Sequence, residues 1–196
     1  KAVFDPENIF NPGKIVDTPP MDTSLRHSPG QGTPDYETVF DFSDTMGVLR
    51  AAEKCNGSGD CRKGPQAGGT MCPSYMATRE EKHTTRARAN ILRQILTEPA
   101  DAEHPFNSEE IKEVMDLCLS CKACKSECPS SVDMTKLKAE FQQHYHKANG
   151  VPLRSRMVAH FADSARLASF APWLYNAFFQ TPILRRIANP LIGFHS

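Results

Sequence analysis

The most chemically informative residues of this chain are four cysteines that lie within a short stretch. They follow the spacing Cys118-x2-Cys121-x2-Cys124-x3-Cys128, and Pro129 comes directly after the last one. Thiolates at steps of three can bind separate iron atoms of one cluster from a single tight turn, whose N–H groups then face the sulfur atoms. Structural zinc sites instead use two Cys-x2-Cys pairs separated by a longer loop. We interpret the run as iron–sulfur ligands and the chain as an electron carrier, with a zinc-stabilised docking module as the alternative.

An incomplete copy of this run lies earlier in the chain. Cys55, Ser58 and Cys61 stand at the same steps of three, and Cys72 precedes Pro73. In two-cluster ferredoxins the fourth cysteine of a run ligates the other cluster. This rule predicts a [4Fe–4S] cluster with the ligands Cys72, Cys118, Cys121 and Cys124. It predicts a second cluster, [4Fe–4S] or [3Fe–4S], with the ligands Cys55, Cys61 and Cys128.

The second predicted cluster is one thiolate short, because Ser58 replaces the middle cysteine. Three chemistries could follow. The site could hold [3Fe–4S], an oxygen of Ser58 or Asp60 could bind the fourth iron, or that iron could stay open to water or substrate. An open iron is a Lewis acid, so the last alternative would be a catalytic site. We favour an electron-transfer role for both clusters.

A charged segment, residues 79–88, follows the first Cys-Pro pair closely. Lys82, His83, Arg86 or Arg88 could lie beside a cluster, where a positive charge would stabilise the reduced form and raise its potential. The alternative is a solvated helix start held by salt bridges.

Capping residues and apolar periodicity predict the helices that hold these loops. Thr84 or Thr85 can cap a helix that runs to Leu96, and Asp133 can cap another that ends at Gly150. The expected buried stripe of the first of these helices is Ala87, Ile91, Leu92 and Ile95. A further helix carries Ile111, Val114 and Met115.

The helix that carries Ile111, Val114 and Met115 also carries Cys118, and it has a capping-box-like start. Asn107 and Glu110 have the spacing of such a box. Residues 16–46 hold four prolines and predict an extended connector, in which Thr38-Val39-Phe40 could form a short strand. Strand signals are almost absent after residue 45. The predicted fold class is therefore all-α, an alpha-helical ferredoxin-like two-cluster module with a long extended N-terminal segment.

Composition narrows the functional classes. Lys and Arg total 23 and Asp and Glu total 23, so no net charge favours nucleic acid or an anionic membrane surface. No signal peptide and no apolar run long enough to span a membrane is visible. Seven cysteines without a secretory signal indicate reduced thiols, hence the cytoplasm or the inner face of the cell membrane. The start at Lys1 suggests a piece of a larger protein.

Three stretches carry a family resemblance. Residues 4–15, FDPENIFNPGKI, resemble the C-terminal signature of FAD-linked oxidases of the vanillyl-alcohol-oxidase type. The segments CNGSGDCR (55–62) and GTMCPSYM (69–76) are similar to large bacterial flavin/iron–sulfur fusion proteins of the D-2-hydroxyglutarate dehydrogenase family. The ferredoxin-like run of cysteines completes the resemblance, which covers most of residues 1–150.

The resemblance implies a domain organisation and a function. Residues 1–15 would end an FAD domain, with Asn11 and Lys14 near the flavin. A linker (16–46), the iron–sulfur module (47–150) and a helical connector (151–196) to a cysteine-rich domain would follow. Electrons would pass from FAD, reduced by a D-2-hydroxy acid such as D-2-hydroxyglutarate, through two clusters to quinone or a carrier protein. The partners would be the other domains of the parent chain, with at most peripheral membrane association and no nucleic acid. Apart from the resemblance, the aromatic residues from Ser169 onward indicate a covered surface: the tail could lie at a membrane interface, and we favour packing against a neighbouring domain.

Overall fold

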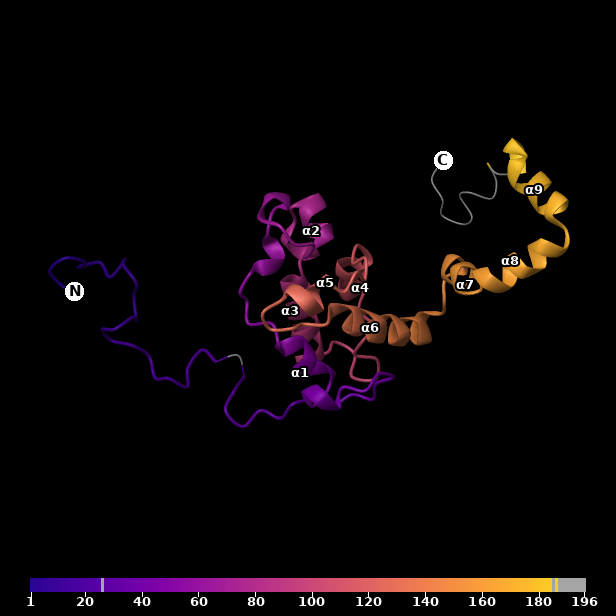
Figure 1. Ribbon diagram of the computed structural model, residues 1–196. Helices are drawn as coiled ribbons and strands as arrows, with labels where there is room; N and C mark the ends of the chain where they lie inside the picture. Colours follow the sequence, from indigo (N-terminus) through magenta and orange to yellow (C-terminus); the bar gives the residue numbers. More distant parts are fainter. Residues whose placement is uncertain (26, 185, 187–196) are drawn as a thin grey trace. The chain divides into compact units, whose positions relative to one another are not determined.

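A computed structural model describes the chain except for residues 26, 185 and 187–196, so the end of the aromatic tail lies outside the described residues (Figure 1). In the described part every regular element is a helix and no strand occurs, which confirms the predicted all-α class. The α-helices are α1 (Val48–Glu53), α2 (Pro73–Thr78), α3 (Thr85–Thr97), α4 (Glu109–Asp116), α5 (Ala123–Glu127), α6 (Met134–Asn149), α7 (Leu153–Ala159), α8 (Phe161–Phe170) and α9 (Pro172–Gln180). None of the described helices is both long enough and apolar enough to cross a membrane.

The chain divides into two compact units, Lys1–Pro34 and Asp35–Ser196. The first unit consists of turns, and its most connected side chain is Asp5. The carboxylate of Asp5 accepts hydrogen bonds from the N–H groups of Ile9 (2.8 Å) and Phe10 (3.0 Å) and pairs with Lys1. The bond to Lys1 and these two N–H groups lower the pKa of Asp5, against a smaller opposing effect of desolvation. The functional domain boundaries predicted from the sequence stay predictions.

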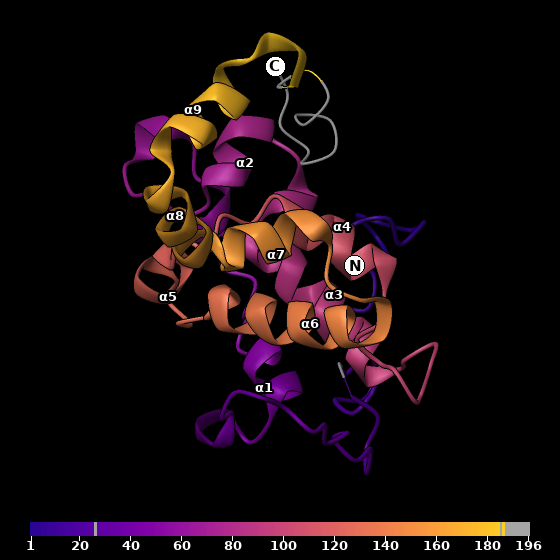
Figure 2. The ribbon, with the colours of Figure 1, turned by 90° about the vertical axis from the view of Figure 1, so that its right-hand side faces the viewer.

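In the second unit α3 is the central helix, and α1, α4 and α6 pack against it (Figures 1 and 2). The core that they enclose is apolar, and many of its large buried members come from three helices and two loops. They are Leu92, Leu96, Phe106, Ile111, Met115, Val132, Met134, Leu137 and Phe141. Four of the cysteines lie in the same cluster of buried residues: Cys55, Cys61, Cys72 and Cys124. The loops that carry the cysteines are therefore anchored to the core.

Helix starts follow local capping chemistry. Thr84 caps α3 by accepting a hydrogen bond from the N–H of Ala87, and Asp133 caps α6 by accepting one from Lys136. Gly150 ends α6 with a φ of 83°, which a residue with a Cβ rarely adopts. The predicted capping box at Asn107 is wrong, because the hydroxyl of Ser108 accepts the bond that begins α4.

The buried face of α3 differs from the predicted stripe. Its buried residues are Thr85, Arg88, Ala89, Leu92 and Leu96. Ala87, Ile91 and Ile95 are only partly buried, so the face is rotated relative to the prediction. The reason is that Arg88 finds buried hydrogen-bond acceptors, which apolar periodicity does not register.

The predicted strand at residues 38–40 is absent. The backbone N–H groups of Val39 and Phe40 donate instead to the carboxylate of Glu140, at 2.8 and 2.9 Å. Glu140 is fully buried in α6, and His144 lies 2.8 Å from its Oε1 atom. One carboxylate offers two acceptors to adjacent N–H groups, so this segment needs no partner strand to satisfy its backbone. Tyr36 adds a hydrogen bond from its hydroxyl to the carbonyl oxygen of Leu96.

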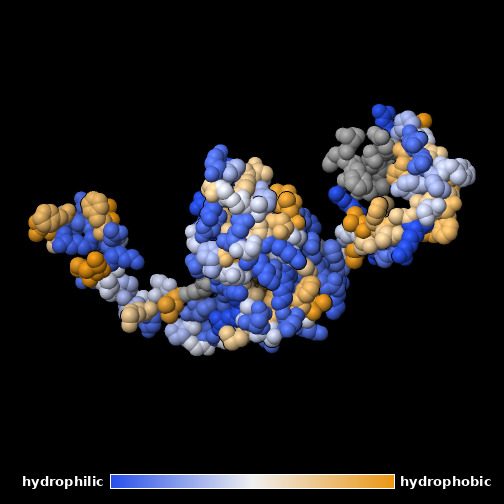
Figure 3. Space-filling model, in the orientation of Figure 1, coloured by the Kyte–Doolittle hydropathy of each residue, from blue (hydrophilic) through white to orange (hydrophobic). Residues whose placement is uncertain are grey.

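Helices α7, α8 and α9 succeed one another and expose many large apolar side chains (Figure 3). Phe161, Leu167, Phe170 and Trp173 are between 65% and 85% exposed. This exposure is consistent with the expected packing against another domain, which stays a prediction.

Candidate iron–sulfur centres

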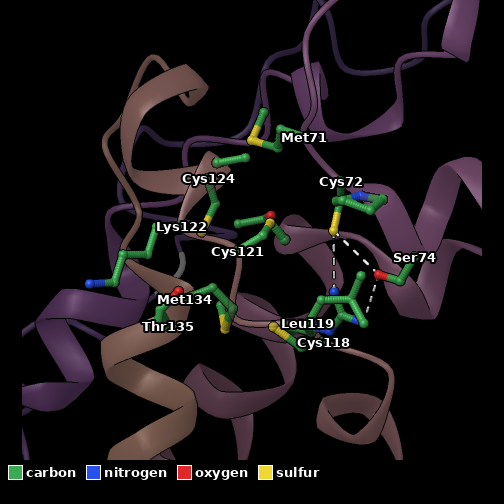
Figure 4. A pocket seen from close by; sticks show the side chains of 14 residues that line it. Met71, Cys72, Ser74, Cys118, Leu119, Cys121, Lys122, Cys124, Met134 and Thr135 are labelled. Carbon is green, nitrogen blue, oxygen red and sulfur yellow. Dashed lines mark hydrogen bonds between the residues drawn. The ribbon is translucent and has the colours of Figure 1, made fainter.

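The first candidate centre is a cavity that collects cysteines from both cysteine-bearing segments. Cys72 stands at the N-cap of α2, Cys118 and Cys121 follow α4, and Cys124 lies in α5. All four line one cavity together with Met134 and Thr135 at the start of α6. Figure 4 shows the four cysteine side chains around a common space. These are the four residues that the crossed ligand rule groups together.

The second candidate centre collects the remaining cysteines. Cys55 follows α1, Cys61 lies in a short 3-10 helix (Asp60–Arg62), and Cys128 ends α5. These three residues line one cavity, and Ser58 and Asp60 line it with them. Both oxygen-bearing candidates for the missing fourth ligand are therefore at the cavity.

The two cavities are neighbours. Met71 and Thr85 line both of them. Met71 is buried in the loop before α2, and Thr85 is the first residue of α3. A shared wall of this kind keeps the two sites close, as transfer of electrons between them requires.

Burial dominates the electrostatics of two of the thiols. It raises the pKa of Cys61, although a hydrogen bond from the N–H of Arg86, at 3.4 Å from the sulfur, acts in the opposite direction. Burial likewise raises the pKa of Cys124, opposed in part by the N–H groups of Met134 and Thr135. Since only thiolates bind iron, these N–H groups favour the ligating form of the buried sulfurs.

In the charged segment 79–88 some residues lie beside the first cavity and others form a solvated helix start. Lys82 is exposed and pairs with Glu113 at 3.0 Å, as a solvated helix start would. Arg88 is completely buried and its Nη1 atom lies 3.3 Å from the sulfur of Cys72. The Arg86 guanidinium binds Glu81, so only its backbone N–H reaches a cysteine.

His83 is the fourth candidate of this segment. Its ring is buried, and Nδ1 lies 2.7 Å from the hydroxyl of Thr78. Its carbonyl oxygen accepts hydrogen bonds from Ser74 and Arg88, beside Cys72. The backbone of His83, rather than its ring, therefore takes part in the surroundings of the first cavity.

Lys138 is a second buried cation that the sequence analysis missed. Its Nζ atom donates to the carbonyl oxygens of Met115 (2.8 Å) and Cys118 (2.6 Å). The pKa of Lys138 is lowered, mainly because burial disfavours its charged form. A negative charge on Cys118 acts in the opposite direction, to a smaller extent. A sequence signal did exist, because Lys138 continues the buried stripe of Met134, Leu137 and Phe141 on α6.

Glu127 is another residue that the sequence analysis missed. Its carboxylate accepts hydrogen bonds from the N–H and hydroxyl of Thr70 and from the N–H of Met71. Gly69 has a φ of +81°, and a Cβ there would lie 2.5 Å from an oxygen of Glu127. Glu127 thus ties the loop before Cys72 to the helix before Cys128. No sequence pattern predicts this contact, because the two residues, Thr70 and Glu127, are 57 positions apart.

The two residues expected near a flavin lie in a turn of the first unit. The N–H of Lys14 donates to the carbonyl oxygen of Asn11 at 3.2 Å, and both residues are exposed. Their role beside a flavin stays a prediction.

The donor set of the first cavity fits a four-iron cluster, because its four thiols can supply one thiolate to each iron. Within the described residues no three His, Cys, Asp or Glu side chains converge on a point that could hold a single metal ion.

One family model matches the cysteine-bearing part of the chain. Residues 54–133 match the family described as the 4Fe-4S dicluster domain. This range includes all seven cysteines, in agreement with the iron–sulfur module expected there.

The chain is similar over most of its length to particular enzymes. It is 31% identical to D-2-hydroxyglutarate dehydrogenase of Escherichia coli, over 98% of this chain and 22% of that protein. It is 29% identical to D-2-hydroxyglutarate dehydrogenase of Pseudomonas putida, over 90% of this chain and 20% of that protein. A probable glycolate oxidase iron-sulfur subunit of Bacillus subtilis is 26% identical over 44% of this chain and 19% of that protein. The resemblance inferred from the sequence is thus confirmed.

The chain spans about a fifth of the length of the D-2-hydroxyglutarate dehydrogenases that it matches. No solved structure gives a significant match.

Proposed function

We propose that the chain holds two iron–sulfur clusters with crossed ligands and passes electrons through them. The first site uses Cys72, Cys118, Cys121 and Cys124; the second uses Cys55, Cys61 and Cys128, with Ser58 or Asp60 as a candidate oxygen ligand. The observation that carries the proposal is that the seven cysteines line two adjacent cavities. Each cavity is lined by cysteines from both the 55–72 segment and the 118–128 segment.

The chain's own residues would supply three things to these sites. The cysteines would hold the clusters, and the core behind Cys55, Cys61 and Cys72 would keep water from much of their surface. Backbone N–H groups, such as that of Arg86 beside Cys61, would stabilise negative charge on the sulfurs. Each bound cluster would accept and release one electron at a time.

The proposed reaction belongs to the parent protein. A D-2-hydroxy acid, such as D-2-hydroxyglutarate, would give two electrons and two protons to FAD and become the 2-oxo acid. The two electrons would leave singly through this module and, with two protons, would reduce a quinone to a quinol or would reduce a carrier protein. The names of the relatives support the substrate class, and FAD would lie in a domain of the same parent chain near residues 1–15. A C-terminal cysteine-rich domain would be a further partner, in the cytoplasm or on the inner face of the membrane.

Anaerobic reconstitution of the chain with iron and sulfide tests the proposal. We expect a brown protein with two clusters by iron and acid-labile sulfide analysis and EPR signals on reduction. Zinc without labile sulfide would favour the docking module instead. A colourless protein that takes up neither iron nor sulfide would refute the electron-transfer function.

Cys128→Ser tests the crossing, with Ser131→Ala as a control on the same loop. The crossed arrangement predicts that Cys128→Ser perturbs the EPR signal of the three-thiolate site and preserves that of the four-thiolate site. Perturbation of the four-thiolate signal alone would show that the ligands are not crossed.

A further inference from the structure

Arg88 is a buried cation in an unusual environment. Its side chain has no exposed surface, although it carries a permanent charge. Its hydrogen bonds are all to uncharged acceptors or to sulfur: the carbonyl oxygens of Val114 (2.9 Å) and His83 (2.8 Å), Ser74 Oγ (3.1 Å) and Cys72 Sγ (3.3 Å).

No carboxylate is among the hydrogen-bond or ion-pair partners of Arg88 within the described part of the chain. A buried charge without a counter-charge is strongly unfavourable. Of the four partners, only Cys72 can become anionic, and it does so when its thiolate binds iron. The buried charge of Arg88 therefore gains a counter-charge when a cluster is bound at the first site and Cys72 is a thiolate.

Lys138 adds a second positive charge beside the same site. It is buried, and its ammonium group donates a hydrogen bond to the carbonyl oxygen of Cys118. The acidic side chains of the neighbouring elements have partners of their own, although Asp116 also lies close enough to Lys138 to act on its charge. Asp116 pairs with Lys112, Asp133 with Lys125, and Glu127 binds Thr70 and Met71.

The second cavity has no comparable excess of positive charge among its lining residues. Arg86, which lines it, directs its guanidinium to Glu81 at 2.7 and 2.9 Å. Lys63 pairs with Asp60, also a lining residue, at 2.9 Å. The cations near this cavity are thus each paired with a carboxylate, and Glu81 is shared by Arg62 and Arg86.

We propose that Arg88 and Lys138 are the buried counter-charges of the Cys72–Cys118–Cys121–Cys124 site and raise the reduction potential of that site alone. The inference rests on the proposed electron-transfer function. Reduction adds one electron, supplied by the reduced flavin of the parent, and re-oxidation passes the same electron to the next acceptor, so no atom is transferred. The added negative charge is stabilised by the two fixed cations, which favours the reduced state.

A redox titration of the reconstituted full chain, monitored by EPR, tests this inference. Arg88→Gln removes the charge and keeps hydrogen-bonding capacity, and Lys138→Gln removes the other charge. We expect each variant to lower the midpoint potential of the four-thiolate site and to leave that of the second site unchanged. Arg88→Lys, which keeps the charge, should restore most of the potential. Lys82→Gln, which removes an exposed charge from the same segment as Arg88, should change neither potential.

The inference is overturned if both midpoints are unchanged in Arg88→Gln and Lys138→Gln, or if the shift is upward. It is also overturned if Arg88→Lys shifts the potential as far as Arg88→Gln, since geometry and not charge would then matter. If Arg88→Gln fails to retain iron, Lys138→Gln and Arg88→Lys still decide the outcome. A wild-type chain that binds no iron and sulfide would instead refute the proposed function itself.

Discussion

The bond between Glu140 and the segment before α1 allows a prediction with a worked magnitude. In Glu140→Gln one of the two acceptor oxygens becomes an NH2 group, so one of the N–H groups of Val39 and Phe40 faces a donor. A hydrogen bond to a charged group contributes about 1.5–3 kcal/mol, and the buried position of Glu140 places its loss in that range. Because 1.4 kcal/mol corresponds to about a tenfold change in an equilibrium constant, local opening should become roughly 10- to 100-fold more frequent.

Native-state amide hydrogen exchange measures this opening directly. The amides of Val39 and Phe40 should exchange roughly 10- to 100-fold faster in Glu140→Gln, while that of Leu92 in the core should not. Glu37→Gln is the matched control, since it makes the same chemical change at an exposed position of the same segment. Unchanged exchange at both amides would refute the reasoning. Equal acceleration at Leu92 would also refute it, because the effect would then be global.

Three further predictions concern the sites and the core. Ser58→Cys should complete the second ligand set and convert any [3Fe–4S] EPR signal to that of [4Fe–4S]. Electron transfer should survive this change, whereas loss of a turnover reaction at the site would indicate an open catalytic iron. Removal of both clusters by a chelator under oxidising conditions should lower the melting temperature measured by circular dichroism, because the ligands tie the two halves together; an equal melting temperature would contradict this. Leu92→Ala should destabilise the module by about 2–5 kcal/mol in urea unfolding, against less than about 0.5 kcal/mol for Leu167→Ala, which is exposed. Equal effects would contradict the assignment of the core.

Local chemistry made part of the fold predictable. The starts of α3 and α6 follow from one side-chain acceptor each, at Thr84 and Asp133, because capping acts within a few residues. The four-cysteine run indicated clusters for a similar reason, since its spacing places the thiolates on one turn. The crossed grouping required a rule about partner segments, and the cavities are consistent with it.

The failures have a common physical cause, which is contact between residues far apart in the sequence. Val39 and Phe40 have high strand propensity, but Glu140, about 100 residues away, satisfies their N–H groups without a second strand. For Arg88 the sequence left two positions open, beside a cluster or on a solvated helix start, and it gave no sign of complete burial. Arg88 is buried because acceptors from three other segments surround it, and a hydrophobic pattern carries no information about them.

The sharing of each cavity between the two cysteine segments has a consequence for how the protein is made. If the cavities hold clusters as proposed, neither segment can complete a site alone, because each site needs thiolates from both. During synthesis the three cysteines of the first segment would leave the ribosome before any of their partners. Cys72 would wait as a free thiol until Cys124 had emerged, and Cys55 and Cys61 until Cys128 had. Iron–sulfur insertion would therefore be a late event on this chain, and the nascent first segment would depend on a reducing environment in the interval.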